Sequence, residues 1–418
     1  MHRSWRLLVP LLAALAAGCG GLGDEKPTAP HNDAGRSDGV PIQLDTQSLL
    51  PDTSPVSPDT TAMADAGGLD TEGTEAGDGT STEAGGETGP APASVDSGVG
   101  PEAPAEPASA DSGVGPEAPA ARPATIIVLP DTQYYASSYP DVFAGQTKWI
   151  LAQQLPLNIA AVLHVGDIVD GDTQSQWNVA GTSMHSLDGK VPYVVVPGNH
   201  DTNGSRVTMM DSYFGPASMP WVNGTMTAGQ MENNYALIDV GPQQWLVIAL
   251  EFGPRDAVVA WAEKVLKAYP TTPAILLTHA YLYSDGTRYN VAVGGTDSSK
   301  DIFQWWYPQY YGFTPAEGIN DGEMLWQKLV LPNSNVRIVL CGHQTGWARM
   351  TSTRPDGTSV HQVLSDYQWL DGKNFGFGYL RVLQLDYVKK TIAVQTYSPY
   401  LQQYLTDDAN QFTLDLNL

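Results

Sequence analysis

Apolar runs that end directly in polar residues constrain this chain more than any other feature of its sequence. Runs with the length of a β-strand lie at 125–129, 159–165, 192–196, 274–277 and 336–340. Segments with apolar residues at helical spacing lie at 146–155 and 256–268. A hairpin is expected at 236–240 and 245–250, and antiparallel strands at 360–364, 379–385 and 391–396. Uninterrupted apolar strands followed by helices predict an α/β fold with sheet buried on both faces.

Polar residues follow several of these strands at the point where each strand ends. The groups are Asp131, Gly166-Asp167-Ile168-Val169-Asp170, Gly198-Asn199-His200-Asp201, His279 and Gly342-His343. Ligands gather at the carboxyl ends of strands in folds of this kind, so we expect these side chains to share one edge. Carboxylates, an amide and imidazoles together suit two divalent metal ions that share one carboxylate, with a histidine close by.

The polar groups resemble the calcineurin-like metallophosphoesterase superfamily, whose pattern runs D-x-H, G-D-x-x-D, G-N-H-[DE], H and G-H-x-H. The resemblance covers most of 125–345, and the residues at 129–135, 366–368 and 396–399 look like a secreted bacterial subgroup. It implies an α/β sandwich of two mixed β-sheets flanked by helices.

The resemblance also implies a site with two divalent metal ions, whose identity stays open among Mn, Fe, Zn, Mg and Ca. The implied metal ligands are Asp131, Gln133, Asp167, Asn199, His279 and His343. The Asp167 carboxylate would bridge the two ions, which would activate a water molecule against phosphorus. His200 would protonate the leaving alcohol or stabilise the phosphoryl charge, and Asp170 would hold the His200 ring.

Two positions depart from the family pattern. Gln133 stands where D-x-H has its histidine, and Thr345 stands at the second histidine of G-H-x-H. Both family positions serve the metal bound by Asp131, so we expect that site to be oxygen-rich and weaker, favouring Mg²⁺, Mn²⁺ or Ca²⁺. Gly171 replaces a phosphate-binding arginine of the protein-phosphatase branch, which disfavours a phosphoprotein substrate.

Substrate contacts are expected from Asn199, His200 and Arg349, although an arginine can equally lie on the solvated surface. The aromatic residues at 305–311 belong either to the core or to a substrate-binding loop. The Asp366-Tyr367-Gln368 segment either frames the pocket or forms a structural turn. His164, inside a strand, is expected to be a hydrogen-bonded core histidine.

The N-terminal residues 1–19 have the features of a lipoprotein signal peptide. Arg3 and Arg6 precede an apolar stretch that is too short to span a bilayer. The following Leu15-Ala16-Ala17-Gly18-Cys19 resembles a bacterial lipobox, which would make Cys19 the lipidation site. Gly20 after the cysteine favours an outer-membrane lipoprotein, on the periplasmic or the cell-surface side. An ordinary secretory signal with an incidental cysteine is the alternative.

Residues 20–122 form a segment of a different composition, rich in Ala, Pro, Gly, Ser, Thr, Asp and Glu. Such a segment buries too little apolar surface to offset its ordering entropy, so we predict a disordered linker. The sequence DSGVGPEAPA occurs at 96–105 and again at 111–120, as expected of a lengthened tether. Most of the formal net charge of −24 lies here, and it argues against specific nucleic-acid recognition.

The remaining residues, 123–418, are long enough for one large domain, which we expect to be monomeric. Cys341 is expected to be a buried, inert thiol. The favoured function is metal-dependent hydrolysis of a phosphomonoester or phosphodiester, in a small molecule or a polymer, by a protein tethered outside the cytoplasm. The alternative is a non-catalytic surface lipoprotein that uses the fold as a binding module. A glycosidase would leave Asn199, His279 and His343 without a task.

Overall fold

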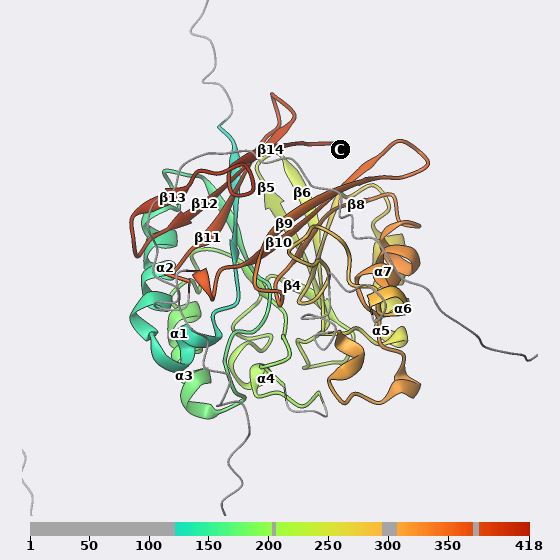
Figure 1. Ribbon diagram of the computed structural model, residues 1–418. Coiled ribbons are helices and arrows are strands. Elements are labelled where there is room, and N and C mark those ends of the chain that lie inside the picture. The colour runs from blue at the N-terminus through green and yellow to red at the C-terminus, as the bar shows by residue number, and fades with distance from the viewer. Residues whose placement is uncertain (1–121, 203–205, 295–306, 371–375) are drawn as a thin grey trace, which may run out of the picture. The chain divides into compact units, whose positions relative to one another are not determined.

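Two mixed β-sheets packed face to face form the centre of the domain in the computed structural model (Figure 1). The structure describes residues 122–202, 206–294, 307–370 and 376–418. Cys19, the predicted signal peptide and nearly all of the predicted linker lie outside the described residues, as do Trp305 and Trp306. Within those four described ranges, no helix has the length and apolar character needed to cross a bilayer.

The first sheet has the strand order β13-β12-β11-β1-β2-β3, with β14 paired to β12. Its strands are β1 (Ala124–Leu129), β2 (Ile159–His164), β3 (Tyr193–Val195), β11 (Leu380–Asp386), β12 (Thr391–Ser398), β13 (Gln403–Leu405) and β14 (Phe412–Asp415). Strands β1, β2 and β3 run parallel to one another, whereas β11 pairs with β1 in the antiparallel direction. The three parallel strands therefore end at the same edge.

The second sheet has the strand order β4-β5-β6-β7-β8-β10-β9. Its strands are β4 (Val222–Thr225), β5 (Asn234–Val240), β6 (Gln243–Leu250), β7 (Ala274–Thr278), β8 (Val336–Cys341), β9 (Gly346–Thr353) and β10 (Ser359–Asp366). Strands β6, β7, β8 and β10 are parallel to their neighbours in this series. Their carboxyl ends therefore also meet at one edge.

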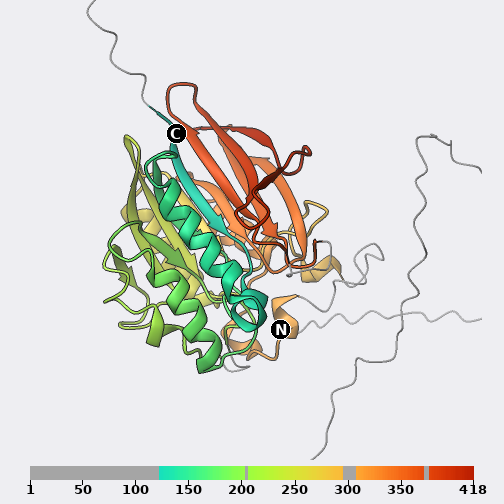
Figure 2. The ribbon, with the colours of Figure 1, turned by 90° about the vertical axis from the view of Figure 1, so that its left-hand side faces the viewer.

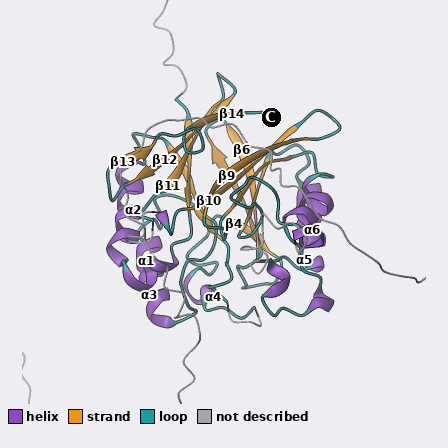
Figure 3. Cartoon of the chain, viewed as in Figure 1, coloured by secondary structure: helices purple, strands orange, loops and turns teal. Residues whose placement is uncertain are grey.

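Helices cover the outer faces of both sheets (Figure 3). They are α1 (Gln133–Ser138), α2 (Pro140–Gln153), α3 (Gln174–His185), α4 (Met210–Tyr213), α5 (Asp256–Ala268), α6 (Val291–Gly294) and α7 (Gly322–Leu325), with a π-helical turn at Trp326–Val330 and 3₁₀ turns at Pro308–Tyr310 and Pro315–Glu317. Helices α1 to α3 lie on the side of the first sheet, and α5 to α7 on the opposite side of the domain (Figures 1 and 2).

Alternation along β1 shows how the layers are held together. Ile126 and Val128 pack into the core between the two sheets, together with residues of β6, β7 and β8. Ile127 and Leu129 point the other way and pack against α2 and α3, where Phe143 and Trp177 are fully buried. Both faces of the strand are thus apolar, as its uninterrupted sequence requires.

The structure confirms the predicted fold class, and most predicted elements agree with it. The predicted helix at 256–268 is α5, and the predicted hairpin is β5 paired with β6. Four strands escaped prediction: β4, β9, β13 and β14. Most residues of β9 are not buried, because β9 is an edge strand of its sheet. Edge strands lack the apolar signature of a doubly covered strand.

Helix α3 was also missed, and helix α2 begins earlier than predicted. The sequence of α3 carries few large apolar side chains, and its burial depends largely on Trp177 and Met184. Helix α2 begins at Pro140, whose fixed φ suits the first helical position. Cys341 is free and buried, and burial raises the pKa of its thiol to about 12, as expected of an inert cysteine.

Candidate metal centre

The carboxyl ends of strands from both sheets bring the predicted metal ligands together. Three ligands follow β1, β2 and β3 of the first sheet, and two follow β7 and β8 of the second. In order, these residues are Asp131, Asp167, Asn199, His279 and His343. Gln133 is the first residue of α1, directly after Asp131 and Thr132. The two sheets thus contribute to one site, as the strand-end pattern predicted.

Asp167, His279 and His343 form a buried cluster whose ligand atoms all lie within 4.8 Å of one another. The Nε2 atom of His279 lies 3.2 Å from Oδ1 of Asp167 and 3.2 Å from Oδ1 of Asn199. Its Nδ1 lies 2.8 Å from the carbonyl oxygen of Val165. Because a carbonyl only accepts, Nδ1 carries a proton and donates it, which leaves Nε2 facing two oxygens. That orientation is typical of a metal-binding histidine.

Two buried oxygens beside this cluster have no hydrogen-bond donor. Asp131 accepts a bond from the backbone N–H of His343 through Oδ2, at 3.0 Å, but its Oδ1 has no partner. The Oε1 atom of Gln133 is in the same state. An unsatisfied buried acceptor costs about 1–3 kcal/mol. Two such oxygens in one site therefore fit a cation that is held by these residues.

The charges of the site lead to the same conclusion. Burial, followed by the charges of Asp366 and Asp167, raises the pKa of Asp131 well above its usual range. Burial also raises the pKa of Asp366 to about 7. Burial alone would raise the pKa of Asp167 as well, but the neighbouring His279 and His200 outweigh it and lower that pKa. Several carboxylates compete here for positive charge that a divalent ion would supply.

Backbone strain is concentrated at the same positions. Asp167 has a φ of +48° and His343 a φ of +73°, in the left-handed region that side chains other than glycine rarely adopt. A Cβ atom at Gly198 would overlap the carboxylate of Asp167, and one at Gly342 would overlap that of Asp131. The glycines of two motifs therefore let the ligand carboxylates approach the neighbouring loop closely.

Asp201 holds two of the ligand loops together, a role that the sequence did not reveal. Its Oδ2 accepts the backbone N–H groups of Ile168 and Gly198, at 3.0 and 2.8 Å, and its Oδ1 accepts that of Val169 at 2.8 Å. Asp201 is fully buried. It is therefore a positioning residue for the loops that carry Asp167 and Asn199.

His200 lies at the rim of the cluster with Asp170, as predicted, but the contact between them differs in detail. Its Nδ1 lies 2.8 Å from the backbone carbonyl oxygen of Asp170, and 3.6 Å from the Asp170 carboxylate. The carbonyl, not the side chain, is therefore the closer partner that fixes the ring. Burial lowers the pKa of His200, but the charge of Asp167 and the Asp170 carbonyl outweigh it and raise that pKa.

A cavity of about 210 Å³ opens onto the cluster. Its lining residues are Gln133, Tyr134, Asp167, Asn199, His200, Tyr311, His343, Gln368 and Trp369. The sequence left open whether Gln368 and Tyr311 reach the site, and it assigned no site role to Tyr134, although Tyr134 lies in the 129–135 segment of the resemblance, or to Trp369. The rings of these last two lie 5.4 Å apart, and Trp369 is 50% exposed. Aromatic side chains therefore form part of the cavity wall.

The structure does not bring Arg349 into this cavity. Its guanidinium group lies 4.2 Å from the ring centre of Phe412, on the exposed side of β9. His164 is the predicted core histidine: it is fully buried, with Nε2 2.9 Å from Oγ1 of Thr132 and Nδ1 accepting the N–H of Gly166 at 3.2 Å.

The calcineurin-like phosphoesterase family has a sequence profile that matches residues 124–345, just over half of the chain. The chain belongs to this family. The matched region contains all the predicted metal ligands and ends at Thr345. Family membership supports metal-dependent phosphoester chemistry for the site described above.

Individual relatives have also been compared with the chain. An uncharacterised Bacillus subtilis (strain 168) protein, YvnB, is 35% identical over 313 residues, which cover 70% of this chain. The chain spans only 22% of that protein's length. Among solved structures, a dimetal phosphatase from Danio rerio is similar with a TM-score of 0.42 and 10% identity, over 71% of this chain and 100% of that one. The Plasmodium protein GAP50, an anchor in the inner membrane complex, is similar with a TM-score of 0.37 and 11% identity, over 71% of this chain and 89% of that one.

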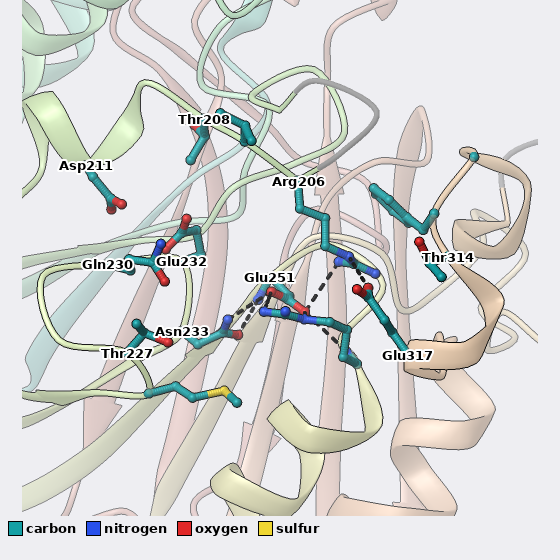
Figure 4. A pocket seen from close by; sticks show the side chains of 15 residues that line it. Arg206, Thr208, Asp211, Thr227, Gln230, Glu232, Asn233, Glu251, Thr314 and Glu317 are labelled. Atoms are coloured by element: carbon teal, nitrogen blue, oxygen red, sulfur yellow. Dashed lines mark hydrogen bonds and ion pairs between the residues drawn. The ribbon is translucent and has the colours of Figure 1, made fainter.

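A second, larger cavity of about 470 Å³ has a wall built on a network of ion pairs (Figure 4). Glu251 is its centre: it accepts bonds from Nε and Nη2 of Arg255, at 2.8 and 3.0 Å, and from Nδ2 of Asn233 at 2.9 Å. Nη1 of Arg206 lies 3.3 Å from the same carboxylate. The Arg206 guanidinium also lies 3.8 Å from the ring centre of Phe313.

Proposed function

We propose that this domain hydrolyses phosphate esters with two divalent metal ions and a metal-activated water molecule. The observation that carries the proposal is that the buried Asp167–His279–His343 cluster lies beside Asp131 and Gln133, whose Oδ1 and Oε1 atoms are buried without a hydrogen-bond donor. A fold kept only as a binding module has no requirement for such atoms. Family membership supports the same reaction class.

The ligand set divides into two parts that share Asp167. His279, His343 and Asn199 would hold one ion, and Asp131 with Gln133 would hold the other. When bound, the ions supply Lewis-acid stabilisation of the phosphoryl oxygens and lower the pKa of the attacking water. The loops fixed by Asp201 keep these ligands in place before substrate arrives.

His200 is proposed to donate a proton to the leaving alcohol. Its ring lines the cavity, and its Nδ1 is fixed by the Asp170 carbonyl oxygen at 2.8 Å, which leaves Nε2 for the substrate. The net effect of its surroundings raises the pKa of His200, which favours the protonated form that a general acid requires.

The substrate class is proposed to be a phosphomonoester or phosphodiester, of a small molecule or a polymer. Asn199 and His200 would contact the phosphoryl group. The leaving group would lie against Tyr134, Tyr311 and Trp369, the aromatic residues of the cavity wall. An aromatic wall of this kind favours planar or sugar-like groups through stacking.

The protein is further proposed to be an exported monomer that is anchored at Cys19 to the outer membrane, with 20–122 as a flexible tether. The N-terminal sequence supports this proposal. Metabolic labelling with a tritiated fatty acid is the direct test. Label in the wild type but not in Cys19→Ala is the expected result, and a labelled Cys19→Ala protein would contradict the assignment.

Hydrolysis of p-nitrophenyl phosphate and bis-p-nitrophenyl phosphate in the presence of Mn²⁺ tests the proposed reaction. Activity should be lost in Asp167→Ala and reduced in His200→Ala by about 10²–10⁴-fold. His185→Ala is the matched control and should keep full activity. His185 is a partly exposed histidine at the end of α3 that pairs with Asp188. A folded wild type that is inactive with every divalent metal would instead favour the binding module.

A further inference from the structure

The end of β10 approaches the metal centre from a part of the chain that follows the family motifs. Strand β10 runs parallel to β8 with Leu364 paired to Cys341. His343 lies two residues beyond Cys341, and Asp366 lies two residues beyond Leu364. The register therefore places Asp366 next to the loop that carries His343, at the edge where the other ligands gather.

Asp366 fixes the side chain of Gln368. Its Oδ1 accepts the backbone N–H of Gln368 at 3.0 Å, and its Oδ2 accepts the side-chain Nε2 of the same residue at 3.0 Å. The amide nitrogen of Gln368 therefore faces Asp366 as the donor of this bond. The amide oxygen, Oε1, must therefore face away from Asp366.

The Gln368 oxygen is buried and has no donor. Gln368 is 7% exposed, lines the metal cavity, and has an Oε1 atom without a hydrogen-bond partner. Gln133 lines the same cavity with an Oε1 atom in the same state, and Oδ1 of Asp131 is also unsatisfied. One such oxygen would carry little weight. Three of them, which follow two strands that end at the same edge, fit one cation as a common partner.

Thr345, which stands at the missing histidine of the family pattern, also has a buried Oγ1 atom without a hydrogen-bond partner, but its hydroxyl is on the β-carbon, so it reaches less far than a histidine or glutamine, and it does not line the cavity. We propose that Gln368, oriented by Asp366, supplies the ligand that Thr345 cannot. The metal of Asp131 would then be bound by oxygens alone, from Asp131, Asp167, Gln133 and Gln368. Oxygen ligands favour Mg²⁺, Mn²⁺ or Ca²⁺ over Zn²⁺, whereas the histidine-containing site suits a softer ion.

This inference rests on the two-metal site proposed above, and Mn²⁺ binding to the full 418-residue chain tests both. Isothermal titration calorimetry of the metal-free wild type should give two sites of unequal affinity. Gln368→Ala should weaken the weaker site by about 10–100-fold and leave the tighter site within about twofold. Gln368→Met keeps nearly the same side-chain volume, removes the amide oxygen, and should weaken Mn²⁺ binding at the weaker site as Gln368→Ala does.

Gln309 offers a matched control. Its Nε2 lies 3.3 Å from Oδ2 of Asp321 and its Oε1 is buried without a partner, as in Gln368, yet it does not line the metal cavity. Gln309→Ala should therefore leave both Mn²⁺ affinities unchanged. A Gln309 effect as large as that of Gln368 would overturn the inference, because both would then act through general loosening of the fold.

Electron paramagnetic resonance of the Mn²⁺ complexes gives a second readout that does not depend on activity. The wild type with two equivalents of Mn²⁺ should show an exchange-coupled pair, and Gln368→Ala should show mainly the signal of a single ion. Two sites in the wild type with unchanged binding in Gln368→Ala would overturn the ligand assignment and leave the two-metal function standing. Fewer than two sites in the wild type would contradict the two-metal function itself. If Gln368→Ala does not fold, unchanged binding at the weaker site in Gln368→Met would overturn the assignment.

Discussion

The two polar cavities of this domain differ in how their charges are satisfied. In the larger cavity, the Glu251 carboxylate is bonded to two arginines and an asparagine (Figure 4). In the smaller one, burial and the neighbouring carboxylates raise the pKa values of Asp131 and Asp366. The buried Oδ1 atom of Asp131 and Oε1 atom of Gln133 have no hydrogen-bond donor. The carboxylate of Glu251 thus has cationic partners within the protein, whereas the unpaired oxygens of Asp131 and Gln133 fit a cation from outside.

Cavity size is therefore a poor guide to function in this domain. The larger cavity is a stabilising ion-pair network by its own contacts. The smaller one combines unsatisfied ligands, strained backbone at Asp167 and His343, and the family's motifs. Substitutions in the two cavities should therefore have opposite signatures: loss of activity without loss of stability in one, and loss of stability without a direct effect on chemistry in the other.

The largest effect is expected from Asp167→Asn. Removing the shared carboxylate should abolish tight metal binding and lower kcat/KM for bis-p-nitrophenyl phosphate by roughly 10⁴-fold, since metal ions supply several kcal/mol of transition-state stabilisation. The metal-free variant should unfold at the same denaturant concentration as the metal-free wild type, or higher. An active Asp167→Asn enzyme would remove the distinction between the cavities.

Acid should destabilise the support beneath the metal loops through His164. Burial, and next the charge of His279, lowers the pKa of His164 to about 3. The unfolded chain binds this proton near pH 6.5, so the contribution is fully present above pH 6.5 and is lost as pH falls toward 3, by about 1.4 kcal/mol per pH unit. Unfolding of the wild type and His164→Gln, measured by urea titration from pH 4 to 7, should show a steeper pH dependence for the wild type. Parallel curves would contradict this assignment.

Glu251→Gln should lower the free energy of unfolding by about 3–5 kcal/mol, because it leaves Arg206 and Arg255 without their shared carboxylate in a largely buried position. The loss should be the same in Mn²⁺ and in chelator. Glu263→Gln, in the exposed Glu263–Lys267 pair, is the control and should cost at most about 1 kcal/mol. A loss of unfolding free energy that appears only with Mn²⁺ would show that the two cavities are energetically coupled.

Asp131→Asn should change the stability of the domain in opposite directions with and without Mn²⁺. At pH 8 the metal-free variant should be more stable than the wild type by about 1 kcal/mol, because a neutral amide avoids the cost of burying a charge and, next, its repulsion by Asp366 and Asp167. With saturating Mn²⁺ the order should reverse, since the variant loses a ligand. Chemical denaturation with and without Mn²⁺ measures both. A variant that is less stable in both states would show that the carboxylates are not in conflict.

The smallest effect is expected at Arg349, which sequence reasoning assigned to substrate. Its guanidinium stacks on Phe412 outside the cavity lining, so Arg349→Ala should change KM for p-nitrophenyl phosphate by less than about twofold. Trp369→Ala, from the cavity wall, is the comparison and should raise KM by more. A larger rise in KM for Arg349→Ala than for Trp369→Ala would instead indicate that Arg349 contacts the substrate.

The sequence was sufficient to place the predicted metal ligands at one edge, because each of them follows a buried strand within a few residues, and the family resemblance supplied their proposed role as ligands. Asp131, Asn199 and His279 are placed by local strand ends that meet at a common edge, so the two sheets did not have to be assembled to predict them. The apolar strands and the helix α5 were predictable for the same local reason, since their burial is written in their periodicity.

Other features depend on tertiary contacts that no local pattern reports. Tyr311 and Trp369 reach the cavity from segments far apart in the sequence, and the Gln368 oxygen is directed only by its bond to Asp366. The His200 ring is fixed by a backbone carbonyl, which every residue possesses. Arg349 has the residue type of a phosphate ligand, but the antiparallel pairing of β9 with β10 places it away from the site.

Anomalous scattering from a crystal soaked in Mn²⁺ tests the central claim most directly. The account predicts two peaks roughly 3.5–4 Å apart, bridged by the Asp167 carboxylate, with one peak beside His279 and His343 and the other beside Asp131 and Gln133. No peak at Asp167, or a single peak among the charges around Glu251, would contradict it.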